Sequence, residues 1–269
     1  MLCFDLDGTL APIVAHRQHA SVPAGIAALM QALMQHWPVA VVTGRDIDDA
    51  APRLGFRPDW LWGCHGAQRR GAASAVGWDG RCGKPDSSDA PDPIALRRAL
   101  DGCRTLLAQN AQWLAARRVD VEDKGLSIAL HYRHAEAAAS VAAWLDGLLA
   151  PLTCPPSLTR LMPQGLAAGA GPGRAFGLHA EHGHCVLNLS AAAAPDKGDA
   201  LLDLLAHCQL DRALVMGDDA NDEPAFAKAP PDCVSIRIAP AGTPTRARFR
   251  LTEQTQVETL LRTLVQLRR

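Results

Sequence analysis

Acidic side chains follow two short apolar runs of this 269-residue chain. Asp5 and Asp7 come directly after the apolar residues 2–4, and a second acidic group begins one residue after the run 213–216. A carboxylate at the end of a strand can attack phosphorus and become an aspartyl phosphate. A carboxylate two residues away can protonate the leaving alcohol and then activate water. We therefore predict Asp5 as nucleophile and Asp7 as acid/base.

The second acidic group makes a metal site a natural hypothesis. So many carboxylates in one place repel one another unless a hard divalent cation shares them, and Mg²⁺ favours a few carboxylates together with phosphate oxygen and water. Taken alone, Asp-Gly-Thr at 7–9 could be a simple turn that Thr9 closes, and 218–222 could be the capped start of a helix. The predicted ligands are Asp5, Asp7, Asp218 and Asp222, with Asp219 beside them.

A hydroxyl and a lysine complete the phosphate chemistry. Thr43 follows the apolar run 39–42, and Lys197 lies between that run and the second acidic group. Phosphoryl transfer depends mainly on positioning and on neutralising charge at the transferred oxygens. Taken alone, Thr43 could simply mark a strand-to-helix junction, and Lys197 could be a solvated lysine. Together with the acids, Thr43 and Lys197 are predicted to hold the phosphate.

The composition excludes several classes of protein. The 27 basic and 28 acidic residues nearly balance, and no block of like charge suggests a nucleic acid or an anionic membrane. No apolar run approaches a membrane span, and the N-terminus offers no basic stretch followed by an apolar one. The eight cysteines are scattered without a CxxC pair, which favours reduced thiols and a cytoplasmic location.

The order of the expected elements predicts a split α/β protein. Strands at 2–4, 39–42, 61–64, 213–217 and 234–238 alternate with helices at 23–36, 46–54, 199–208, 222–228 and 253–267. Such alternation is typical of a Rossmann-like parallel sheet. A Pro/Asp/Ser-rich stretch at 83–93 marks a linker. We expect a core formed by 1–85 and 192–269 around an inserted domain at 86–191.

The inserted segment has a different pattern. A helix at 94–117 precedes a hairpin of strands at 119–122 and 126–132, joined by a tight turn at 123–125. A helix at 134–149 and two strands near 174–180 and 184–190 follow. The order α-β-β-α-β-β predicts a small antiparallel sheet with helices on one face, an α+β domain.

The ordered set DxDGT…TGR…K…GDxxxD resembles the haloacid dehalogenase-like phosphatase superfamily. Further stretches resemble trehalose-6-phosphate phosphatases, which hydrolyse trehalose 6-phosphate with Mg²⁺ in trehalose biosynthesis. These stretches are FDLDGTLAPI at 4–13, GCHGA at 63–67, VEDKGLSIALHYR at 121–133 and the acidic pair 218–219.

The resemblance implies a role for further residues. The insert would be a cap that closes over the sugar, and Asp7 would also bind the metal through its carbonyl. Asn221 and Asp222 would support the metal site. The sugar would be bound by Glu122 and Lys124 on the cap, and by Arg45, His65 and Gly66 on the core side.

Two positions depart from the family pattern. The family usually has threonine where this chain has Asn221, and Glu-hydrophobic-Arg-Pro where this chain has the sequence 188–191. A sugar-binding glutamate is thus Asn188 here, which keeps hydrogen bonding but loses charge assistance.

The function expected from these observations is Mg²⁺-dependent hydrolysis of a small sugar phosphate, trehalose 6-phosphate first. Another glycoside phosphate, such as sucrose or glucosylglycerol phosphate, is the nearest alternative, because the sugar contacts depart from the family. A phosphomutase would share the aspartyl phosphate, and a phosphosugar-sensing module would lack Asp5 or Asp7, both of which are present. We expect a monomer that binds neither nucleic acid nor membrane.

Overall fold

The chain divides into two compact units, each described here by itself. One comprises Met1–Ala90 with Pro195–Arg269, and the other comprises Pro91–Ala194. The computed structural model describes residues 1–14, 16–71, 92–153, 177–183 and 185–267. Most of the predicted linker at 83–93, and the starts of the two strands expected near 174–180 and 184–190, lie outside the described residues.

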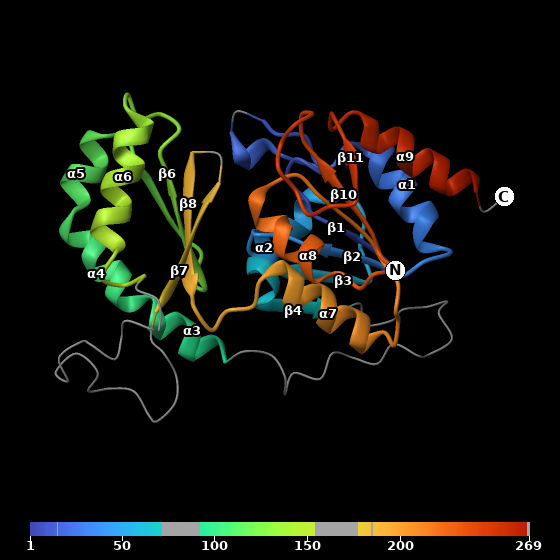
Figure 1. Ribbon diagram of the computed structural model, residues 1–269, viewed down its shortest axis with the longest axis horizontal. Helices are drawn as coiled ribbons and strands as arrows, with labels where there is room; N and C mark the ends of the chain where they lie inside the picture. The colour runs from blue at the N-terminus through green and yellow to red at the C-terminus, as the bar shows by residue number, and fades with distance from the viewer. Residues whose placement is uncertain (15, 72–91, 154–176, 184, 268–269) are drawn as a thin grey trace. The chain divides into compact units, whose positions relative to one another are not determined.

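A seven-stranded sheet forms the centre of the first unit (Figure 1). Its strand order is β11-β10-β9-β1-β2-β3-β4, and every neighbouring pair is parallel except β3 with β4. The strands are β1 (Leu2–Phe4), β2 (Val39–Val42), β3 (Trp60–Gly63), β4 (Gln68–Gly71), β9 (Leu214–Gly217), β10 (Val234–Ile238) and β11 (Phe249–Leu251). The apolar runs are strands because both faces of this sheet are covered.

Helices pack on both faces of this sheet. One apolar cluster joins Met30 and Leu261 to one face, and another joins Leu204 and Phe226 to the other face. Helices α1 and α9 lie side by side on the first face, and α7 and α8 lie side by side on the second. The helices are α1 (Ala24–Met34), α2 (Ile47–Ala50), α7 (Lys197–His207), α8 (Glu223–Lys228) and α9 (Gln256–Gln266).

The second unit is an antiparallel sheet with helices along one face. Its strand order is β5-β6-β8-β7, and Leu130, Leu187 and Leu145 belong to the apolar cluster that joins sheet and helices. Figure 1 shows α4, α5 and α6 on the same side of these strands. The elements are α3 (Pro93–Ala99), α4 (Asp101–Gln109), α5 (Ala111–Ala116), β5 (Asp120–Asp123), β6 (Ser127–His131), α6 (Ala138–Leu149), β7 (Leu178–Gly183) and β8 (Val186–Ala191).

The predicted fold class is confirmed, a mostly parallel α/β core with an inserted α+β unit, but one predicted helix is wrong. The helix expected at 94–117 is three helices, α3 to α5, separated by breaks at Leu100 and Asn110. The side-chain amide of Asn110 donates to the carbonyl of Leu106 at 2.8 Å, so it competes with the backbone for the last turn of α4. Within the described ranges, no helix combines the length and apolar character needed to cross a membrane.

Candidate active site

The carboxyl ends of three adjacent strands bring the candidate residues together. Strand β1 lies between β2 and β9, so Asp5, Thr43 and Asp218 follow the ends of neighbouring parallel strands. The Asp5 amide donates to the carbonyl of Met216 at 2.9 Å, which extends the β1–β9 pairing to the site. Asp5 is 7% exposed and Thr43 is 1% exposed. The topology therefore brings together the predicted nucleophile, a hydroxyl and an acid that lie far apart in the sequence.

Lys197 connects the predicted nucleophile to the second acidic group. Its ammonium donates to Asp5 Oδ1 and to Asp222 Oδ1, both at 2.7 Å, and all three side chains are buried. Burial alone would lower the pKa of Lys197, but Asp222 and Asp5 raise it above its ordinary range. Lys197 opens α7, where Asp196 caps the helix by accepting from two backbone amides. The cap fixes the point from which the ammonium reaches the site.

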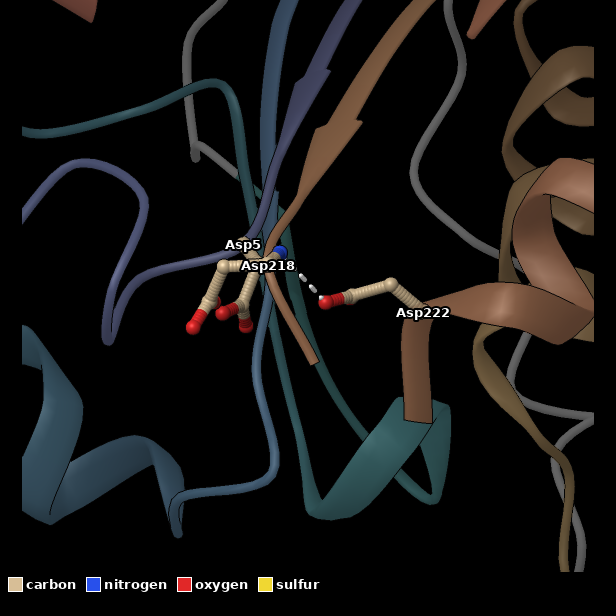
Figure 2. A group of neighbouring side chains, drawn as sticks. All are labelled: Asp5, Asp218 and Asp222. Carbon is tan, nitrogen blue, oxygen red and sulfur yellow. Dashed lines mark hydrogen bonds between the residues drawn. The ribbon is translucent and has the colours of Figure 1, made fainter. Parts of the chain in front are cut away.

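Asp222 holds the loop that carries Asp218. Its Oδ2 accepts from the amides of Asp218 and Asp219 at 2.9 Å, while Oδ1 accepts from Lys197. Figure 2 shows the Asp5 and Asp218 carboxylates side by side, with Asp222 reaching the Asp218 amide from the other side. Both Asp222 oxygens are thus engaged, and a direct metal bond from Asp222 would need one of these contacts to change.

Three carboxylates gather closely enough to hold one cation. Asp5, Asp218 and Asp222 each offer an oxygen, and these oxygens lie within 4.8 Å of one another. Burial raises the pKa of Asp5 from 3.8 to about 7, against the opposing effect of Lys197. Burial, followed by repulsion from Asp5 and Asp222, raises the pKa of Asp218 well above its ordinary value. Nearby, the buried Oδ1 of Asn221 has no hydrogen-bond partner among the described residues. This cluster is rich in oxygen ligands and short of positive charge, so it fits a hard divalent cation.

Gly8 leaves room for the Asp218 carboxylate. A Cβ at this position would lie 2.0 Å from Asp218 Oδ2, and its φ of +81° is a conformation that other residues adopt at a cost. We expect Gly8→Ala to lower the free energy of unfolding by about 1–3 kcal/mol, measured by urea denaturation. Gly147→Ala is the matched control: Gly147 lies in α6 with open space around it, so this change should stabilise by about 0.5–1 kcal/mol. Equal stability of Gly8→Ala and wild type would contradict the close approach.

Asp7 is held by a paired arginine. Arg45 donates through Nε and Nη2 to the two Asp7 oxygens, both at 2.6 Å, and through Nη1 to Asp49 at 2.7 Å. Arg53 also bonds Asp49, and although burial opposes it, these contacts lower the pKa of Asp49 to about 2. Asp49 and Arg53 were not among the predicted site residues. The spacing of four residues from Arg45 to Asp49 and from Asp49 to Arg53 on a short helical stretch was the available signal.

The remaining core-side residues surround Thr43. The Thr43 hydroxyl accepts from the Arg45 amide at 3.1 Å, and the Thr43 carbonyl accepts from the His65 amide at 2.9 Å. The His65 imidazole lies against Gly44, where a Cβ would be 2.7 Å from its Cε1. Gly66 comes next, in a turn with φ of +109°. The structure thus brings His65 next to the Thr43 segment.

The predicted sugar-binding residues of the second unit lie on its sheet, except Lys124, which lies in the turn after β5. A carboxylate oxygen of Glu122 accepts from Nε2 of the His131 ring at 3.0 Å and lies 3.9 Å from the Lys124 ammonium. Arg104 of α4 bonds the side chain of Asp123 and the carbonyl of Gly125, so the hairpin tip is fixed to a helix. Asn188 lies on β8, half-buried.

Comparison with known proteins identifies the family. The trehalose-phosphatase family profile matches residues 3–150. A trehalose-phosphate phosphatase of Mycobacterium ulcerans (strain Agy99) is 30% identical over 240 residues, which cover 87% of this chain and 53% of the relative. The chain belongs to the trehalose-phosphatase family. It spans about half the length of this relative and of a second, 29% identical trehalose-phosphate phosphatase from Mycobacterium marinum (strain ATCC BAA-535 / M).

Solved structures of other proteins share the fold of this trehalose-phosphatase family member. The C-terminal domain of Candida albicans trehalose-6-phosphate phosphatase superposes with a TM-score of 0.73 at 18% identity, covering 98% of this chain and 91% of that one. A sucrose-phosphatase from Synechocystis sp. PCC6803, solved with sucrose and phosphate, gives 0.57 at 15% identity, covering 99% and 97%. At these identities the likeness concerns the fold alone.

Proposed function

We propose that this chain hydrolyses trehalose 6-phosphate to trehalose and phosphate, with Mg²⁺, through an aspartyl phosphate on Asp5. The observation that carries the proposal is that Asp5 and Asp218, at the ends of adjacent strands, meet Lys197 from the start of α7 in a trehalose-phosphatase family member. Neither the phosphomutase nor the sensing alternative is favoured by any contact in the site.

The reaction uses residues from three segments: Asp5 and Asp7 after β1, Thr43 after β2, and Lys197 at the start of α7. Asp5 attacks the phosphorus, and the sugar oxygen leaves with a proton from Asp7. Lys197 neutralises charge beside Asp5, and the Thr43 hydroxyl binds a phosphate oxygen. Asp7 then takes a proton from the water that attacks the phosphoryl group on Asp5. Asp5 and Asp218, the Asp7 carbonyl and, at the edge of the cluster, Asp222 with Asn221 would hold or support Mg²⁺, which neutralises the transferred oxygens.

In this scheme Arg45 positions Asp7, in addition to any contact that it makes with the sugar. Both oxygens of Asp7 are occupied by its guanidinium, so the acid/base is held at a fixed place until substrate arrives. Because Arg45 is also bonded to Asp49, its own position is fixed from the opposite side. We propose that this positioning is the main contribution of Arg45.

We propose that the first unit is the catalytic core and the second is the substrate-specificity cap. Glu122, Lys124 and Asn188 of the second unit would bind sugar hydroxyls, with His65 and Gly66 on the core side. The six described cysteines are free, which agrees with a reducing compartment such as the cytoplasm.

The direct test is a panel of phosphate esters at equal concentration. Trehalose 6-phosphate, sucrose 6-phosphate, glucosylglycerol phosphate and glucose 6-phosphate would be compared by released phosphate and free sugar. We expect trehalose 6-phosphate to have the highest kcat/KM, with phosphate and trehalose formed in equal amounts. A higher value for another sugar would reassign the substrate, and sugar turnover without phosphate release would indicate a mutase.

Metal removal should stop the reaction and weaken the fold. Without a cation the buried Asp5 and Asp218 repel each other. Adding Mg²⁺ to chelator-treated protein should therefore raise the melting temperature by a few degrees, which corresponds to about 1–3 kcal/mol in the free energy of unfolding. Activity should fall to background with chelator and return with Mg²⁺. Full activity in chelator, or an unchanged melting temperature, would contradict the metal site.

The sugar contacts can be separated from the chemistry. Glu122→Ala and Lys124→Ala should each lower kcat/KM for trehalose 6-phosphate by about tenfold or more, since a charged hydrogen bond is lost. Hydrolysis of p-nitrophenyl phosphate, which has no sugar hydroxyls, should change little. Equal losses on the two substrates would mean that these residues do not bind the sugar.

A further inference from the structure

The sheet of the second unit has two faces with opposite chemistry. Leu187 and Leu189 of β8 belong to the apolar cluster under the helices. Side chains alternate along a strand, so Asn188 between them lies on the second face. The strand register places Asn188 opposite Ala129 of β6 and opposite Glu181 of β7, and Ala129 is also opposite Glu122 of β5. One row therefore crosses all four strands, the polar row Glu122, Ala129, Asn188 and Glu181.

We propose that the polar row binds the hydroxyl groups of the substrate's sugar and that Glu181 is its second carboxylate. This inference rests on the proposed function, because it names further contacts for the same substrate. Glu181 is a specificity-determining residue in this view. It is half-buried, and it lies on the edge strand at the opposite end of the row from Glu122.

The chemistry of the row suits a polyol. Carboxylates accept strong, charge-assisted hydrogen bonds from hydroxyl groups, and the Asn188 amide can both donate and accept. Ala129 is 1% exposed and contributes only a methyl group, so no bulky side chain separates Glu122 from Asn188 along the row. Directly opposite residues have Cβ atoms about 5 Å apart, so Asn188 and Glu181 can bond neighbouring hydroxyls.

A neighbouring hydroxyl supports a ligand on this face. Ser127 lies two residues before Ala129 and so shares its face. It is 6% exposed, and its Oγ has no hydrogen-bond partner among the described residues. Leaving a buried hydroxyl unpaired costs about 1–3 kcal/mol, which a bound sugar hydroxyl would relieve.

The length of the row indicates more than one sugar ring. Three strand spacings of about 4.8 Å separate β5 from β7, or roughly 14 Å between the backbones at Glu122 and Glu181. A disaccharide spans that separation with a hydroxyl-bearing ring near each end, whereas a single ring covers only part of it. Glu181 should therefore matter for a disaccharide phosphate and not for glucose 6-phosphate.

The test compares three substrates with matched variants of the full chain. Glu181→Gln keeps the shape and removes the charge, and Glu136→Gln makes the same change at an exposed position outside the sheet. We expect Glu181→Gln to lower kcat/KM for trehalose 6-phosphate about tenfold, equivalent to about 1.4 kcal/mol. Values for glucose 6-phosphate and p-nitrophenyl phosphate should stay near wild type, as should all values for Glu136→Gln.

A second variant keeps the proposal falsifiable. Adding Asn188→Glu to Glu181→Gln moves the carboxylate by one strand and should recover part of the lost kcat/KM for trehalose 6-phosphate. An unchanged value for Glu181→Gln, or equal losses on all three substrates, would overturn the inference while the proposed function stands. Wild-type protein that releases phosphate from p-nitrophenyl phosphate but not from trehalose 6-phosphate would instead contradict the proposed substrate, and the inference with it.

Discussion

Asp5→Asn should abolish turnover and leave the fold intact. The amide keeps the size of the side chain but cannot attack phosphorus, so kcat should fall by at least roughly 10⁴-fold with trehalose 6-phosphate. The fold should survive because the change removes one negative charge from a buried cluster in which burial already raises the pKa of Asp5 to about 7. The measurements are phosphate release and the urea midpoint of unfolding.

Asp59→Asn is the matched control for that substitution. Asp59 is also partly buried, and its Oδ2 accepts from the Val39 amide at 2.8 Å, but it does not belong to the acidic cluster. Its replacement should cost some stability and leave kcat near wild type. Activity of Asp5→Asn within tenfold of wild type would disprove the nucleophile assignment.

Lys197→Met should damage both stability and activity. It removes the ammonium that bonds two buried carboxylates, and breaking a buried ion pair on one side costs about 3–5 kcal/mol. The loss of stability in Lys197→Met should grow as pH rises. The pKa of Asp5 is above its ordinary value of 3.8, so the folded state binds more protons and stability falls as pH rises from about 4 through 7. Without Lys197 that pKa rises further, which extends the fall to higher pH.

Lys228→Met provides the comparison. Lys228 also bonds two aspartates, Asp196 and Asp199, but its side chain is 37% exposed, so its loss should cost under about 1 kcal/mol. Urea denaturation in metal-free buffer at pH 5, 7 and 8 would follow both variants. Equal costs for the two lysines, or a loss for Lys197→Met that shrinks as pH rises, would contradict the buried-pair account.

The strands that deliver the site were predictable because their sequences are almost wholly apolar. Strands β1, β2, β9 and β10 fall within a residue of the predicted ranges. Strand β4 was missed because it is an edge strand of mostly polar residues, Gln68 to Gly71, and β11 was missed because Arg250 interrupts its short apolar sequence. Such strands form because a neighbouring strand offers hydrogen bonds. The local sequence does not indicate that this neighbour is present.

The gathering of candidate residues was predictable, but their contacts were not. Parallel strand ends meet at one edge, and this rule alone brings Asp5, Thr43 and Asp218 together. The Arg45–Asp7 pair joins residues 38 positions apart through side-chain conformations that no sequence pattern encodes. Likewise, nothing in the sequence distinguishes Asp222, which anchors two backbone amides, from Asp218, whose carboxylate lies beside Asp5.

The most direct test of the central claim is to find the phosphoryl group on the protein during turnover. Protein mixed with trehalose 6-phosphate and Mg²⁺ would be quenched in acid and digested, and its peptides analysed by mass spectrometry. We expect one phosphoryl group on the peptide that contains Asp5, and none in Asp5→Asn. Steady release of phosphate with no phosphoryl group on that peptide, or with the group on another residue, would contradict the account.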